Sequence, residues 1–243
     1  APDVFEVHPN TTGVYRPRAP MPVPVDDAVA LVYQDRYVYL ISGWHDVGNV
    51  NLVQVYDTQE NTWAQAEPWP GAAVFGHAGG IVGNHLVVCG GAEVQYPSSG
   101  PRQFVLSEAC WQGQIRADDH RRIDWRPMPA MPMGARYRAA ATGMQDEQHA
   151  RVVFLGGTHN PYNYNGIGYD GEPAQALASV VAFDLKQQQW SCLNPLSEAS
   201  MDHRSAVNHQ QAVVLVGGMN NQQTVQTSVQ TWQPQQVLAQ CAK

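Results

Sequence analysis

Four apolar runs in this chain each end in two consecutive small residues, and this repeat limits the possible folds more than any other feature. The runs lie at residues 38–43, 86–91, 152–157 and 213–218. Each is followed by a variable loop and a second apolar segment, and usually by a tryptophan ahead of a proline. A unit of about 50 residues that recurs in this way indicates an array of equivalent sheets around one axis.

The first complete repeat predicts the internal structure of each unit. It reads as four short strands, at residues 28–32, 37–41, 51–56 and 62–66. Asp57 suits the last turn because its side chain can bond to the following backbone, and Trp63 is expected to pack between neighbouring sheets. Trp125 and Trp190 stand in the equivalent places. Four-stranded meanders in radial array make an all-β propeller, with the glycine pairs where backbones converge on the axis.

We predict a single propeller domain over residues 1–243 with about four blades. Their approximate bounds are 23–70, 71–132, 133–200 and 201–243, with residues 1–22 as a partial blade or closing strand.

The two ends of the chain leave two alternatives open. Residues 14–20 read as a lone outer strand, which would close a small ring by pairing with the last blade. Residues 3–8, however, read as one more strand, which that closure leaves over. We therefore favour a longer propeller whose further blades precede this segment.

Composition makes several partners poor candidates. The net charge is −7 and the chain has two lysines, Lys186 and Lys243, which argues against nucleic acid as a partner. No run of 18 apolar residues predicts a membrane span. No basic and apolar leader begins the chain, so any export signal is expected to be removed or to lie outside it.

The four cysteines show no metal-binding spacing. Cys89 lies inside an apolar strand, which favours a buried, inert thiol. One disulfide among Cys110, Cys192 and Cys241 is a further alternative, and the redox compartment stays open.

The sequence predicts neither a metal nor a cofactor. Nine histidines occur, yet none forms an HxH or HxxxH pair. No GxSxG motif supports a serine nucleophile, and no glycine run resembles a phosphate-binding loop.

The loop at residues 158–178 is a candidate binding segment because it is long and rich in tyrosine and asparagine. Aromatic faces stack on the C–H faces of a sugar, whereas amide and hydroxyl groups pair with its hydroxyls. The candidate substrate-binding residues in this loop are His159, Tyr162, Asn163, Tyr164 and Tyr169. The alternative is a surface loop that covers the edge of a blade.

A second long loop, at residues 92–103, carries Glu93, Tyr96 and Arg102. A carboxylate could act as acid and base, a guanidinium could anchor an anionic substrate, and Tyr96 could contact it. The alternative is a solvated ion pair.

These features together resemble kelch-repeat propellers, and among them the bacterial N-acetylneuraminate epimerase (sialic acid mutarotase) branch. The resemblance rests on residues 55–70 and 76–93, on the insertion at 157–172 and on 216–233. It spans about residues 14–238, which would correspond to the last four of six blades. The interval between Glu93 and Arg102 is longer here than in that branch.

The resemblance implies a cofactor-independent exchange of the anomers of a sialic-acid-like sugar. Glu93 would move the anomeric proton, and Arg102 would hold the sugar carboxylate. It also implies a periplasmic or secreted protein. The alternative function is a non-catalytic scaffold whose loop face binds a protein or a glycan.

Overall fold

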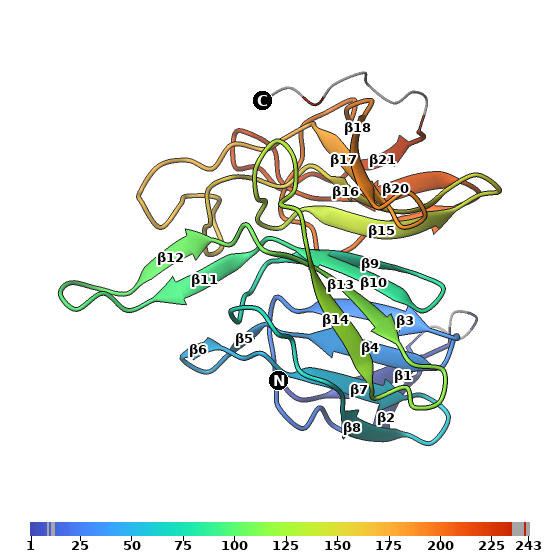
Figure 1. Ribbon diagram of the computed structural model, residues 1–243. Helices are drawn as coiled ribbons and strands as arrows, with labels where there is room; N and C mark the ends of the chain where they lie inside the picture. The colour runs from blue at the N-terminus through green and yellow to red at the C-terminus, as the bar shows by residue number, and fades with distance from the viewer. Residues whose placement is uncertain (9, 11–12, 235–240, 242–243) are drawn as a thin grey trace.

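The chain is built from β-strands that form separate twisted sheets. The computed structural model describes residues 1–8, 10, 13–234 and 241, and the strands in them gather into sheets placed one beside the next (Figure 1). This is the predicted all-β propeller arrangement of about four blades.

Three blades are complete four-stranded antiparallel meanders in chain order. The first contains β3 (Val29–Tyr33), β4 (Tyr37–Ile41), β7 (Val53–Asp57) and β8 (Thr62–Gln65). The second contains β9 (Ala78–Val82), β10 (His85–Cys89), β13 (Cys110–Ile115) and β14 (Ile123–Met128). The third contains β15 (Ala140–Gln145), β16 (Ala150–Leu155), β17 (Val180–Asp184) and β18 (Gln189–Leu193). The strands expected in the first repeat are confirmed to within one or two residues.

The fourth blade and the N-terminal sheet are smaller. The fourth contains β19 (Val207–His209), β20 (Ala212–Val216) and β21 (Val229–Trp232). At the other end, β1 (Val4–Val7) pairs with β2 (Tyr15–Arg18). Because β2 takes β1 as its partner, the small closed ring considered from the sequence is not formed by the described residues.

The hydrophobic core lies between successive blades. Separate buried clusters join the first blade to the second, the second to the third and the third to the fourth. The middle blades are therefore buried on both faces, which explains why strands such as β10, β16 and β17 read as continuous apolar runs instead of alternating ones.

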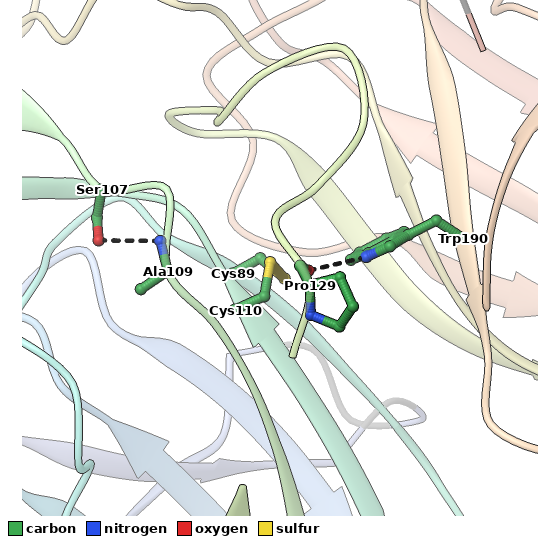
Figure 2. Close-up of a disulfide and its surroundings, with 6 residues drawn as sticks. All are labelled: Cys89, Ser107, Ala109, Cys110, Pro129 and Trp190. Carbon is green, nitrogen blue, oxygen red and sulfur yellow. Dashed lines mark hydrogen bonds between the residues drawn. A yellow bond between two sulfur atoms is a disulfide. The ribbon is translucent and has the colours of Figure 1, made fainter. Parts of the chain in front are cut away.

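Equivalent tryptophans fasten each blade to the sheet before it. The indole N–H of Trp63 donates to the carbonyl of Ala19 at 2.9 Å. The indole N–H of Trp190 donates to the carbonyl of Pro129 at 3.0 Å (Figure 2). The indole N–H of Trp125 reaches Glu67 at 3.5 Å. The predicted packing of these residues between blades is confirmed.

The small-residue pairs turn the chain where blades meet. Both residues of each pair have left-handed φ, including Ser42. A Cβ at Gly156 would lie 2.2 Å from the carbonyl oxygen of Ser200 in the next blade, so only glycine fits there. In the first pair, the hydroxyl of Ser42 lies within hydrogen-bond distance of the carbonyl oxygens of Val50 and Val74, at 2.8 and 2.9 Å, and accepts from the amide of Val74.

The expectation of a free thiol at Cys89 is wrong. Cys89 and Cys110 are directly opposed on β10 and β13 and form a disulfide (Figure 2). A second disulfide joins Cys192 on β18 to Cys241. An apolar setting alone does not distinguish a buried thiol from a cystine, and the pairing depends on register. Disulfides persist in oxidising compartments. The export implied by the resemblance stays a prediction.

The two outermost sheets leave apolar side chains exposed. Phe5, Val7 and Tyr15 lie on one face of β1 and β2, and Val216 and Val229 lie on the last sheet. Within the described residues no further sheet covers these faces. The further blades expected from the sequence would cover them, and their existence stays a prediction.

Candidate functional site

The site begins with one repeated backbone position at the inner end of each blade. Asp27, Gly76, Arg138 and Asp202 occupy it, and all four have left-handed φ between 48 and 67°. Backbone hydrogen bonds link successive positions, from Gly76 N to Asp27 O at 2.9 Å and from Arg138 N to Gly76 O at 2.7 Å. The side chains of four distant segments are thereby brought to one axis.

Three of these positions carry charge and form a buried network. The guanidinium of Arg138 donates to one carboxylate oxygen of Asp27 at 2.5 and 3.1 Å, and to Asp202 at 3.0 Å. Arg204 contacts the other oxygen of Asp27. Burial lowers the pKa of Arg138, whereas Tyr137 and Asp27 raise it, and the net direction is upward. Arg138 is therefore a fixed cation whose charge is compensated within the fold.

Gly76 leaves room for the ring that supports this network. A Cβ at Gly76 would lie 2.2 Å from the ring of Tyr137. The guanidinium of Arg138 lies 4.9 Å from the ring centroid of Tyr137 and 5.0 Å from that of Tyr162. Gly76 is thus the one of the four repeated positions that carries no charge, and the ring of Tyr137 fills the space beside it.

A cavity of about 520 Å³ lies against this network, on the side from which the inserted hairpins project (Figure 1). These hairpins are β5 (Trp44–His45) with β6 (Gly48–Asn49) and β11 (Ala92–Gln95) with β12 (Gln103–Leu106). The cavity is lined by Asp26, Asp27, Trp44, Asp46, Phe75, Arg102, Phe104, Arg138, Asn163, Tyr164 and Tyr169. Three blades contribute, as expected for a ligand site at the mouth of a propeller.

The cavity combines aromatic faces with one accessible cation. The rings of Phe104 and Tyr169 are stacked with centroids 3.8 Å apart. The guanidinium of Arg102 lies 5.2 Å from the ring centroid of Trp44 and 5.3 Å from that of Phe104. Within the described part of the chain, Arg102 donates a single long hydrogen bond, of 3.4 Å, to the carbonyl oxygen of Val47, so its charge is free to meet a ligand anion.

Several predicted site residues come together here. Arg102, Asn163, Tyr164 and Tyr169 all line the cavity. Tyr162 is fully buried beneath it, where its carbonyl accepts from the hydroxyl of Tyr137 at 2.9 Å. Tyr162 therefore supports the site without lining it.

Two predicted substrate-binding residues, His159 and Tyr96, lie outside the cavity lining. The ring of His159 is exposed, with its Nδ1 2.8 Å from the carbonyl oxygen of Ala135. Tyr96 is 69% exposed near the tip of the β11–β12 hairpin. Their role as substrate-binding residues stays a prediction.

Glu93 lies on the opposite face of its hairpin from Arg102. It pairs with Val105, the neighbour of Phe104, and successive residues of a strand face opposite ways. Arg102 lies beside the Phe104 ring and shares its face, so only Arg102 of the implied catalytic pair lines the cavity. The catalytic role of Glu93 stays a prediction, for which a test is given below.

The loop at 158–178 is ordered rather than structureless. Isolated bridges connect Thr158 to Ala176 and Tyr162 to Gly168, and the amide of Ala176 donates to Asn221 in the fourth blade. These contacts explain how a long loop presents Asn163, Tyr164 and Tyr169 to the cavity.

The sequence did not predict the buried charged network of Asp27, Arg138 and Asp202 beside the cavity. Asp27, Gly76 and Arg138 each stand two residues before the first strand of their blade. That shared spacing was readable from the repeat, but Asp27 and Arg138 are 111 positions apart and nothing local signals their contact.

No group of three or more His, Cys, Asp or Glu residues in the described segments could hold a metal ion. Nor do those segments contain a helix with the length and apolar character to cross a bilayer.

Two buried histidines near the inner ends of blades predict loss of stability in acid. Burial lowers the pKa values of His77 and His203 to about 4. Unfolded histidine titrates near 6.5, so between pH 6.5 and 4 the unfolded chain binds more protons, and the free energy of unfolding falls as the pH falls. For each histidine, the free energy of unfolding falls by about 3 kcal/mol as the pH falls through this window. Urea unfolding of wild type and His77→Gln at several pH values measures this; an unchanged pH dependence in the variant contradicts it.

Fold and site together define a β-propeller with a cavity at its axis. The chain matches no protein-family model. It is 26% identical over 227 residues to the kelch-like protein terF of Aspergillus terreus, covering 89% of this chain and 43% of that protein. It is also 24% identical over 176 residues to N-acetylneuraminate epimerase of Salmonella typhimurium, covering 70% of this chain and 42% of that protein.

Among solved structures, YjhT is similar, with a TM-score of 0.72 and 12% identity over 93% of this chain and 71% of that one. At this identity the likeness concerns the fold. The chain is thus a kelch propeller that resembles the N-acetylneuraminate epimerase branch, and it spans less than half the length of the curated relatives it matches.

Proposed function

We propose that the axial cavity binds an acidic sugar and that the protein exchanges the anomers of that sugar. The observation that carries this proposal is Arg102, an accessible guanidinium held over the rings of Trp44 and Phe104. Stacked aromatic faces suit the C–H face of a sugar, and a guanidinium suits a carboxylate. The distant similarity to N-acetylneuraminate epimerase supports the choice of a sialic-acid-like substrate.

The charge arrangement favours a ligand with a single negative charge. Arg138 is occupied by Asp27 and Asp202, which leaves Arg102 as the cation of the cavity lining without a carboxylate partner. Asp26 and Asp46 also line the cavity and would repel a second anionic group. Anomer exchange changes neither redox state nor group attachment, so the proposed reaction needs no cofactor.

Replacing Arg102 by alanine is expected to weaken both binding and catalysis. A hydrogen bond to a charged group contributes about 1.5–3 kcal/mol, so we expect a loss of roughly 10- to 100-fold. The experiment adds the 243-residue protein to one pure anomer of N-acetylneuraminate and follows equilibration by NMR. Arg116→Ala, on an exposed arginine paired with Asp118, is the matched control. No acceleration by wild type contradicts the proposed catalysis.

A second candidate, a protein- or glycan-binding scaffold, is favoured by the β11–β12 hairpin. This hairpin projects from the blades (Figure 1) and exposes Tyr96 and Val105. The chain is also 27% identical over 167 residues to the human Kelch-like protein 34, covering 68% of this chain and 23% of that protein. Partner capture that survives Arg102→Ala but not Tyr96→Ala would favour this function.

A further inference from the structure

The three aspartates that line the cavity differ in the groups that already contact their carboxylates. Asp27 is buried and bound by Arg138 and Arg204. The carboxylate of Asp46 is exposed to solvent and lies 3.2 Å from Nε2 of His45. Asp26 accepts one hydrogen bond, from the amide of Asp27 at 2.7 Å, and has no cationic partner among the described residues. Asp26 is therefore the lining carboxylate that is free to exchange a proton with a ligand.

The backbone fixes Asp26 beside the aromatic wall. Asp26 and Trp44 exchange two backbone hydrogen bonds of 2.8 Å. Arg102 lies over the same indole, 5.2 Å from its centroid. A carboxylate and a guanidinium are thus placed around one stacking surface. This arrangement suits a sugar acid whose carboxyl group and anomeric hydroxyl share one carbon atom.

We propose that Asp26 accepts and returns the anomeric proton, an assignment that rests on the function proposed above. The proton passes from the anomeric hydroxyl to a carboxylate oxygen of Asp26, and the O–H electron pair forms the ketone C=O bond. The ring C–O bond breaks, and its electrons stay on the ring oxygen, which takes a proton from water. After rotation about the adjacent C–C bond, the hydroxyl formed from the ring oxygen attacks the other face of the ketone. This hydroxyl returns its proton to the hydroxide left by the water molecule, and Asp26 returns the anomeric proton to the former ketone oxygen.

The test compares two carboxamide variants in the anomer assay. Proton transfer by a positioned side chain contributes about 10²- to 10⁴-fold. We expect Asp26→Asn to lower the protein-dependent rate at least 100-fold, while calorimetry shows affinity for N-acetylneuraminate within about threefold of wild type. Retained affinity shows that this variant is folded. Asp124→Asn, on the exposed side of β14, is the matched control.

Glu93→Gln discriminates between Asp26 and the carboxylate implied by family resemblance. Glu93 lies outside the cavity lining. A rate that is lost in Glu93→Gln but kept in Asp26→Asn would assign the proton transfer to Glu93 and overturn the assignment of Asp26. If wild type is active and Asp26→Asn keeps its rate, the assignment of Asp26 is wrong and the proposed function stands. If wild type itself does not accelerate equilibration, the proposed function is wrong and the assignment falls with it.

Discussion

Replacement of Arg138 by methionine is expected to lower the free energy of unfolding by about 3–5 kcal/mol, the range for breaking one side of a buried ion pair. Methionine keeps much of the side-chain volume but leaves the buried carboxylate of Asp27 with Arg204 alone, and Asp202 without Arg138. The effect reaches across the molecule because these residues belong to the first, third and fourth blades. Urea unfolding at neutral pH measures it.

Two comparisons separate charge from packing. The double variant Asp27→Asn with Arg138→Met should recover part of the loss, since it leaves no uncompensated charge at Asp27, and asparagine tolerates left-handed φ. Arg116→Met removes an exposed ion pair and should lower the free energy of unfolding far less, because solvent screens the attraction between exposed charges. A cost for Arg138→Met as small as that of Arg116→Met would contradict a structural role for the network.

Removal of the disulfide between Cys192 and Cys241 is expected to cost about 4 kcal/mol. This bond spans 49 positions and encloses the whole fourth blade, so its loss frees a long loop in the unfolded chain. The bond between Cys89 and Cys110 spans 21 positions and should contribute about 3 kcal/mol on the same basis. The double serine variants, compared by thermal unfolding, give these values.

The fourth blade is expected to lose stability first when the bond between Cys192 and Cys241 is removed. This blade has three strands and one apolar face that no described sheet covers, so it depends on the bond to β18. In the Cys192→Ser, Cys241→Ser variant, we expect amide exchange to rise first in β20 and β21. Protection of these strands at the wild-type level would contradict the anchoring role.

Much of the fold was predictable because its determinants are local and repeated. The glycine pairs, Asp57 in its turn and Trp63 on its outer strand each follow from a short segment. Asp57, for instance, accepts hydrogen bonds from the amides of Gln59 and Glu60, as expected of a turn aspartate. The bond between Cys89 and Cys110 was not predictable because it depends on strand register, which sequence spacing does not fix. The bond between Cys192 and Cys241 is one of the pairings that the sequence left open.

The site residues that lie in long loops were predictable from the sequence. Those at the inner ends of the blades, where the blades converge, were not. Arg102 and Tyr169 were recognised because long loops with aromatic and charged residues are typical of binding surfaces. Asp26 and Arg138 sit in short inner segments with no composition signal, and their proximity arises from radial symmetry. The separation of Glu93 from Arg102 follows from one step of strand alternation, which the interval of nine residues conceals.

The central claim is that the axial cavity recognises a sugar carboxylate through Arg102. Titration calorimetry of the 243-residue protein with N-acetylneuraminate and with its uncharged methyl ester tests this most directly. We predict that the acid binds at least tenfold more tightly than the ester, and that Arg102→Ala abolishes this preference. Equal affinities for acid and ester, or a preference that persists in the variant, would contradict the claim.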